Sequence, residues 1–217
     1  MEILEIMKRR HSVRQYTSQK IEADKRAILQ KMIKECNAEG GLHMQILFDE
    51  PKCFNSMMAH YGKFSGVTDY IALVGKKTDD LEEKTGYYGE KLVLKAQELG
   101  LNTCWVALTH GKSAALIGKD EKQTCLIALG YGENQGVPHV GKKIEEICNY
   151  TDSMPAWFKE GIEAVLLAPT AVNQQKFYFT LTGDTVSAAV KGKGFYTKVD
   201  LGIVKYHFEA VTGRKVQ

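Results

Sequence analysis

The apolar run Asp69-Tyr-Ile-Ala-Leu-Val-Gly75 is the clearest indication of the fold. A short apolar run that ends at a glycine is typical of a strand buried at the centre of a sheet. Further strands are expected at similar apolar runs, over Met44–Phe48, Cys104–Leu108, Thr124–Leu129 and Lys176–Leu181. A turn at Thr182–Asp184 follows the last of these strands.

Helices are expected between and around these strands. Apolar residues recur at helical spacing over residues 3–9, 22–37, 87–99, 157–168 and 197–211. Gly40-Gly41 ends the second helix, Gly100 takes the C-cap position of the third, and Pro169 stops the fourth. This mixture of helices and strands predicts an α+β fold, with antiparallel or mixed sheets flanked by helices.

Composition excludes several classes of protein. Apolar residues make up 44% and charged residues 25% of the 217 residues, so the chain is neither disordered nor built for a membrane. The net charge of +3, without an aromatic and basic stripe, argues against a nucleic-acid-binding module. The five cysteines lack CxxC spacing and the histidines lack HExxH spacing, so neither a metal site nor a disulfide scaffold is expected. Free thiols and the absence of an apolar leader predict a cytoplasmic protein.

The first candidate site is the basic segment Arg9-Arg-His-Ser-Val-Arg-Gln-Tyr16. Side chains alternate along an extended segment, so Arg10, Ser12 and Arg14 are expected to point to one side. Two guanidiniums and a hydroxyl suit a phosphate, because each planar guanidinium binds two oxygens at once. The alternative is a solvated basic turn. Lys142-Lys143 either add charge for the same anion or form an ordinary solvated pair.

The second candidate site is Ala168-Pro-Thr-Ala-Val-Asn-Gln-Gln175, where a helix stops and a polar loop enters a strand. Amide side chains both donate and accept hydrogen bonds, which suits the polar edge of a heteroaromatic ring such as a pyrimidine. The same residue types also favour an ordinary helix stop and turn.

The third candidate site is Gly100-Leu-Asn-Thr-Cys-Trp-Val-Ala107, where small and polar residues permit a close approach to an apolar strand. Trp105 is more often a core residue than a ligand platform. No base partner is evident for Cys104, so we expect a buried small apolar residue rather than a nucleophile.

A weak internal repeat links the two halves of the chain. Gly86-Tyr-Tyr-Gly-Glu-Lys-Leu-Val-Leu94 is similar to Gly194-Phe-Tyr-Thr-Lys-Val-Asp-Leu-Gly202, and each begins a predicted helix. In each half a helix and a strand precede this segment. An internal duplication and chance similarity both remain open on this pattern alone.

Together these segments resemble the nitroreductase family of FMN-dependent oxidoreductases. Arg10–Tyr16 resembles the Arg-x-Ser-x-Arg-x-Tyr box of that family, and Ala168–Gln175 resembles its Ala-Pro-Ser-Ala-x-Asn-x-Gln box. Two further segments resemble the central and closing motifs of the family: Leu94–Trp105, and Ile127–Gly132 followed by Lys142–Ile147. The resemblance implies a nitroreductase-like fold.

The order of the motifs departs from the family pattern, because the Asn box lies near the C-terminus instead of following the first motif. In the family each flavin lies at a homodimer interface. The resemblance to the small, internally duplicated "TM nitroreductase" branch therefore implies two pseudo-dimer-related lobes in one chain. The first lobe, 1–150, would hold the phosphate clamp and the shorter second lobe, 151–217, the Asn loop, packed as one globular unit. Both a monomeric pseudo-dimer and a homodimer remain open.

The resemblance implies FMN as cofactor and NAD(P)H as reductant, with a nitroaromatic, quinone or flavin as the small-molecule acceptor. It implies neither a catalytic side chain nor a metal, because FMN carries the chemistry. The cofactor-binding residues that it implies are Arg10, His11, Ser12, Arg14, Cys104, Trp105, Val106, Ala107, Lys142, Lys143, Thr170, Ala171 and Asn173. The alternatives are a flavin-binding protein without steady turnover, and another flavin chemistry on the same fold, such as dehalogenation or flavin fragmentation.

Overall fold

Two compact units make up the chain in a computed structural model that describes residues 2–217. The sheet unit comprises Arg9–Leu81 and Lys91–Pro138, and the hairpin unit comprises the residues up to Lys8, Glu82–Glu90 and His139–Gln217. The two halves of helix α4 (Leu81–Glu98) therefore belong to different units. The lobes expected at 1–150 and 151–217 have other bounds, and their pseudo-dimer relationship stays a prediction.

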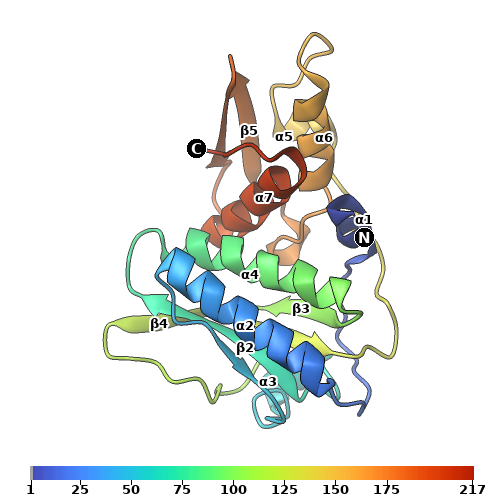
Figure 1. Ribbon diagram of the computed structural model, residues 1–217, viewed down its shortest axis with the longest axis vertical. Helices are drawn as coiled ribbons and strands as arrows, with labels where there is room; N and C mark the ends of the chain where they lie inside the picture. The colour runs from blue at the N-terminus through green and yellow to red at the C-terminus, as the bar shows by residue number, and fades with distance from the viewer. Residues whose placement is uncertain (1) are drawn as a thin grey trace. The chain divides into compact units, whose positions relative to one another are not determined.

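Four antiparallel strands form the sheet of the sheet unit. Their order is β1 (Gln45–Leu47), β2 (Asp69–Lys76), β4 (Glu121–Gly130) and β3 (Asn102–Val106); Figure 1 labels β2, β3 and β4. Residues 69–75 are buried along their whole length and pair with β1 on one side and β4 on the other. The predicted central strand is therefore confirmed.

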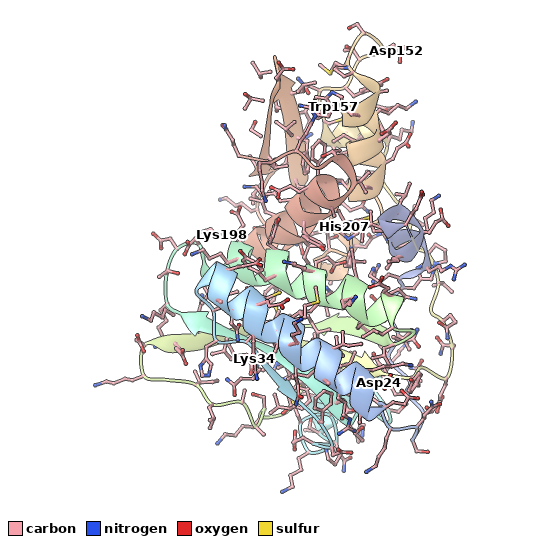
Figure 2. All side chains as sticks on the ribbon, viewed as in Figure 1. Asp24, Lys34, Asp152, Trp157, Lys198 and His207 are labelled. Carbon is pink, nitrogen blue, oxygen red and sulfur yellow. The ribbon has the colours of Figure 1, made fainter. Side chains whose placement is uncertain are left out.

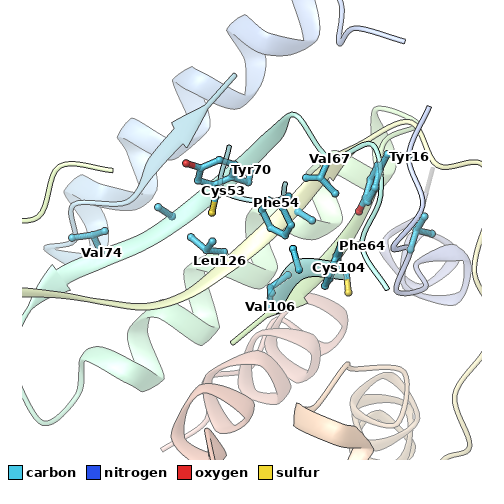
Figure 3. Packing of buried hydrophobic residues seen from close by; sticks show 14 residues of the cluster. Tyr16, Cys53, Phe54, Phe64, Val67, Tyr70, Val74, Cys104, Val106 and Leu126 are labelled. Carbon is cyan, nitrogen blue, oxygen red and sulfur yellow. The ribbon is translucent and has the colours of Figure 1, made fainter. Parts of the chain in front are cut away.

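Apolar side chains cover both faces of this sheet. One face carries a cluster that includes Phe54, Phe64, Tyr70, Val106 and Leu126 (Figure 3). On the other face, Leu29 of α2 (Ala23–Gly40) and Ala96 of α4 pack in a cluster with Leu129 of β4. Burial on both faces explains why β2 and the second half of β4, Cys125–Leu129, are continuous apolar runs rather than alternating ones.

A β-hairpin and two helices form most of the hairpin unit. Strands β5 (Phe177–Thr182) and β6 (Thr185–Val190) pair antiparallel, and helix α6 (Ala156–Val165) packs against α7 (Thr197–Thr212). Val216 pairs with β6 and Asn149 hydrogen-bonds the backbone of Leu181 in β5, so both edges of the hairpin have partners. The short elements of the chain are α1 (Ile3–Arg9), α3 (Met57–Tyr61), α5 (Ile144–Ile147) and the 3-10 turn η1 (Ala171–Asn173).

Helix α7 forms the core of the hairpin unit. The Phe208 ring stacks on Phe179 with centroids 5.4 Å apart and packs on Phe158 at 6.0 Å. The neighbouring His207, labelled in Figure 2, is fully buried and lies with Nε2 2.9 Å from the carboxylate of Glu90, which is also fully buried. This pair gives the buried carboxyl the partner that burial requires.

Several element boundaries differ from the sequence prediction. Strand β3 begins and ends two residues earlier than expected, because Asn102 pairs with Gly130 and the chain leaves the sheet before Leu108. Strand β6 was not predicted, since Val186 is its only fully buried residue and its pairing with β5 makes it a strand. The short helix α3 was also missed. Gly41 is confirmed as the C-cap of α2, at φ 63°, whereas Leu99 is the C-cap of α4 and Gly100 follows it, at φ 78°.

Membrane-spanning helices are absent from residues 2–217, since none there has the length and apolarity that a bilayer crossing requires.

Candidate functional site

The basic segment of the sheet unit is fixed by backbone hydrogen bonds on both sides. The Val13 N–H donates to the carbonyl of Thr103 in β3, over 3.0 Å. The Tyr16 N–H donates to the Ser65 carbonyl over 3.0 Å, and the Ser65 N–H donates to the Arg14 carbonyl over 3.0 Å. Isolated β-bridges therefore tie this segment to Thr103 and Ser65, which sets the directions of its side chains.

Two glycines let other parts of the chain approach this basic segment closely. A Cβ atom on Gly66 would lie 2.0 Å from the Tyr16 carbonyl oxygen. A Cβ atom on Gly136 would lie 2.8 Å from the His11 Cβ and 2.9 Å from the Ser12 carbonyl oxygen. Both glycines also have positive φ, so another residue there would be strained as well as crowded.

Arg10, Ser12 and Arg14 act on one buried thiol, that of Cys104 in β3. Burial raises the pKa of the Cys104 thiol, while the Arg14 charge, a hydrogen bond with Ser12 and the Arg10 charge oppose that rise. These three alternate residues thus share a neighbour, as expected for one side of an extended segment. Because the thiol is buried and its pKa is raised, Cys104 lacks the properties of a nucleophile.

The charge of Arg14 remains available to an anion. The Arg14 side chain is exposed, and no Asp or Glu within residues 2–217 lies at ion-pair distance from it; its guanidinium lies 5.9 Å from the Phe64 ring centre. By contrast, Arg26 of the same unit pairs with Asp49 at 2.7 Å. An available guanidinium beside a second one and a hydroxyl is a donor set that fits a phosphate group.

The outer edge of β3 presents backbone groups beside this cluster. Strand β3 is the last strand of the sheet, and its Thr103 carbonyl bonds outward to Val13. Since backbone directions alternate along a strand, the N–H and C=O of Trp105 face the same outer edge. The predicted residues Val106 and Ala107 follow, at the point where the strand ends.

The amide loop of the hairpin unit, Thr170–Gln175, has an unusual backbone. Val172, Asn173 and Gln175 have φ values of 46°, 54° and 45°. Left-handed backbone is disfavoured for any residue with a Cβ atom, and most strongly for a β-branched one such as Val172. Strain of this kind persists only where the surroundings hold it, and it gathers at functional sites.

Gln175 holds one side of the amide loop. Its Nε2 donates to the Val140 carbonyl and to Asn173 Oδ1, each over 2.9 Å. Its Oε1 accepts from the Lys142 N–H over 2.9 Å, and the Lys142 ammonium donates to the Gln175 carbonyl over 2.9 Å. The Thr170 hydroxyl accepts from the Gln175 N–H over 3.1 Å.

Asp200, a buried residue in the first turns of α7, holds the other side of the amide loop. Its Oδ1 accepts from the Ala171 N–H over 2.9 Å, and its Oδ2 accepts from Gln174 Nε2 over 2.7 Å. Burial raises the pKa of Asp200 to about 6, although the Ala171 N–H and the Gln174 amide oppose that rise.

The structure gathers the sequence-predicted residues into one group within each unit. In the sheet unit Arg10, Ser12, Arg14 and Cys104 lie together, and His11 lies against the loop at Gly136. What these residues do toward a ligand stays a prediction.

In the hairpin unit, Lys142 hydrogen-bonds Gln175, and Gln175 in turn hydrogen-bonds Thr170 and Asn173. Lys143 has a different place: its N–H donates to the Glu146 carboxylate at the start of α5. Lys142 therefore acts as part of the loop, and the ligand roles of these residues also stay predictions.

Sequence reasoning missed Gln175 and Asp200 as residues that hold the amide loop. For Asp200 a signal was present, since it stands between Val199 and Leu201 where the helix buries its apolar side chains. A charged residue within such a buried stretch rarely occurs without a partner that needs it.

Comparison with known proteins gives one family match and several structural likenesses. The family described as "Putative TM nitroreductase" matches residues 2–212. No curated protein matches the chain significantly. The chain is similar to the crystal structure of a "putative nitroreductase" from Thermotoga maritima, with a TM-score of 0.71 and 22% identity over 97% of this chain and 83% of that one.

Two further similar structures match over a smaller share of this chain. A "Putative NADH Oxidase" from Clostridium acetobutylicum has a TM-score of 0.52 and 18% identity, over 69% of this chain and 99% of that one. A "putative nitroreductase in complex with fmn" from Desulfovibrio desulfuricans has a TM-score of 0.53 and 16% identity, over 70% and 98%. These likenesses confirm the expected fold.

Proposed function

The chain belongs to the nitroreductase family described as "Putative TM nitroreductase", and from that premise we propose that it is an FMN-dependent oxidoreductase. It takes hydride from NAD(P)H and reduces a nitroaromatic, quinone or flavin acceptor. The five free, buried cysteines support the further proposal that it works in the reducing cytoplasm.

The cationic group around Cys104 carries this proposal. The charges of Arg10 and Arg14 and the hydroxyl of Ser12 all act on one buried thiol, and Arg14 keeps a charge that no carboxylate of the described chain neutralises. A phosphate ester matches that donor set, because two planar guanidiniums and a hydroxyl offer several hydrogen bonds to one dianion. These residues would hold the FMN phosphate, with the outer edge of β3 at Trp105 facing the ring.

The amide loop would contact the flavin through Thr170, Ala171 and Asn173. The Asn173 amide donates once to the Val140 carbonyl and accepts once from Gln175. An amide has a second N–H and a second oxygen lone pair, so Asn173 keeps capacity for a polar ring edge. The structure in complex with FMN from Desulfovibrio desulfuricans supports the cofactor by fold analogy.

The protein's own part in the reaction is to bind, orient and shield. FMN, when bound, supplies hydride transfer. Arg10 and Ser12 anchor the phosphate, Arg14 places positive charge at the site, and the strained loop fixes its polar groups in position. None of these steps requires a side-chain acid or base.

Flavin binding by the purified protein tests the proposal. We expect a yellow protein, or a colourless one that takes up micromolar FMN, with the increase read in the flavin absorbance band. Riboflavin is the matched control: it lacks the phosphate, so it should bind at least about tenfold more weakly if the arginines bind that group. A protein that binds neither flavin would exclude the proposed function.

Oxidation of NADH or NADPH, followed with and without a nitroaromatic or quinone acceptor, tests turnover. Yellow protein that oxidises neither nucleotide would support the flavin-binding alternative without turnover. A product other than the reduced acceptor would support another flavin chemistry.

A further inference from the structure

Two costly features of the hairpin unit occur at the same place. The amide loop has three non-glycine residues with left-handed backbone, Val172, Asn173 and Gln175. Next to it, Asp200 buries a carboxyl that forms no ion pair with a described Lys, Arg or His. Each feature costs folding free energy, and unfavourable features of this kind are retained where function needs them.

Asp200 connects the two ends of the strained turn. Its Oδ1 accepts from the N–H of Ala171, just before the left-handed residues, over 2.9 Å. Its Oδ2 accepts from Gln174 Nε2 over 2.7 Å, and Gln174 follows the left-handed Val172 and Asn173 and precedes the left-handed Gln175. Gln174 Nε2 also donates to the Phe195 carbonyl over 2.8 Å, which extends the network to the segment before α7.

We propose that Asp200 is a positioning residue that holds the amide loop in its strained conformation and thereby sets the affinity of the flavin site. This inference rests on the proposed function only for the identity of the ligand. Asp200 acts through the loop, by fixing where Thr170, Ala171 and Asn173 lie.

Asparagine cannot replace Asp200 in this network, although it has the same shape. Asn has one oxygen and one NH₂ group, so it can accept from Ala171 only if its NH₂ faces Gln174 Nε2, another donor. Rotating the Gln174 amide would remove that conflict, but it would bring Gln174 Oε1 toward the Phe195 carbonyl and lose the hydrogen bond there. In either arrangement, the Asp200→Asn variant therefore loses one of the hydrogen bonds that hold the loop.

The measurements are FMN affinity by titration and amide hydrogen exchange over residues 171–175. In Asp200→Asn we expect the FMN dissociation constant to rise about tenfold or more, the usual effect of losing a hydrogen bond to a charged group. Amide exchange in the loop should become faster in the same variant, with or without FMN. At pH 8 its melting temperature should equal or exceed that of the wild type, whereas a merely structural role would lower it.

Glu209→Gln is the matched control on the same helix. Glu209 accepts from Tyr87 at 2.7 Å, Lys215 at 2.6 Å and the Val216 N–H at 3.0 Å, and it makes no contact with the amide loop. This variant should keep wild-type FMN affinity and wild-type exchange in the loop. Gln174→Ala removes the hydrogen bond between Gln174 and Asp200 from the loop side, so it should also weaken FMN binding. This variant replaces Asp200→Asn in the test if Asp200→Asn does not fold.

The outcomes separate this inference from the proposed function. If the wild type binds FMN and Asp200→Asn binds it equally well, Asp200 is not a positioning residue. If the wild type binds no FMN, the proposed function fails and exchange in the loop decides: unchanged exchange in Asp200→Asn overturns the holding role, and faster exchange supports it.

Discussion

Arg10 and Arg14 illustrate what alternation in an extended segment achieves at the level of single residues. Their spacing puts both on one side of the segment, and the hydrogen bond from Val13 to Thr103 brings that side to Cys104. Charge gathered in this way is costly unless an anion balances it, because neighbouring like charges repel.

Arg10→Ala and Arg14→Ala should each weaken FMN binding by about 2 kcal/mol or more, roughly 30-fold, through loss of a charge-assisted hydrogen bond. Arg9→Ala is the control, since Arg9 is exposed one position outside the alternation. Calorimetric titration with FMN and riboflavin should show that the two variants lose the preference for FMN. Full affinity in Arg10→Ala would refute the clamp while leaving the family unchanged.

The pH dependence of stability should expose the cost of Asp200. Its pKa rises from an ordinary 3.8 to about 6 on folding, so the folded protein holds this proton more tightly than the unfolded chain. The contribution of Asp200 to the free energy of unfolding is therefore fully present below about pH 4. It falls by about 3 kcal/mol as the pH rises through 6. The uncharged groups that face the carboxyl are the Ala171 N–H and the Gln174 amide.

Asp200→Asn has no proton to lose, so it separates this effect from all other titrations. We expect urea unfolding to show the variant gaining stability relative to the wild type between pH 4 and pH 7. A difference between the two proteins that stays constant with pH would contradict the assignment of the raised pKa to Asp200.

At the level of elements, two glycines allow α4 and α7 to approach closely within the hairpin unit. A Cβ atom on Gly86 would lie 2.1 Å from the Val199 carbonyl oxygen, and one on Gly202 would lie 1.9 Å from the Glu83 carbonyl oxygen. The backbone of each helix thus packs directly against the backbone of the other at a glycine. Residues with side chains at these positions would force the helices apart.

Gly202→Ala should destabilise the protein by about 1–3 kcal/mol or more, because the clash is with backbone and cannot be relieved by rotating a side chain. Gly141→Ala is the control: its added Cβ would meet only ordinary contacts, 3.8 Å from Leu166, without positive φ. Thermal unfolding should leave the control near wild type. A wild-type melting temperature in Gly202→Ala would contradict this packing.

The same contact supports the internal duplication, which stays a prediction. Gly86 contacts Val199, and Gly202 contacts Glu83. Val199 lies 116 positions after Glu83, and Gly202 lies 116 positions after Gly86, so the two contacts involve equivalent positions of the two helices. Strands β2 and β6 begin at Asp69 and Thr185, and helices α4 and α7 begin at Leu81 and Thr197, again 116 apart. The sequence echo pairs Gly86 with Gly194 instead, so packing and sequence similarity indicate different registers.

At the scale of the whole molecule, the question is whether one chain completes a flavin site. The arginine cluster belongs to the sheet unit and the amide loop to the hairpin unit. If both act on one cofactor within a chain, mixing Arg10→Ala and Asn173→Ala proteins should restore no FMN binding. If they act across a homodimer, subunit exchange should restore about a quarter of the sites, because half of the mixed dimers' sites are intact. The mass of the protein in solution should be measured alongside this test.

The central strand, the glycines at the ends of α2 and α4, the α+β class and the two chemically distinctive segments could all be predicted from the residues alone. Local patterns were sufficient for these features. Burial on both faces, left-handed helix ends and alternating side chains each follow from the residue types at neighbouring positions. The folded structure was needed to show that the arginine charges act on Cys104, that Thr185–Val190 is a strand, and that Asp200 holds the amide loop. These contacts join residues far apart in the chain, and only packing, which removes water from both partners at once, selects them from the many pairings that the residue types allow.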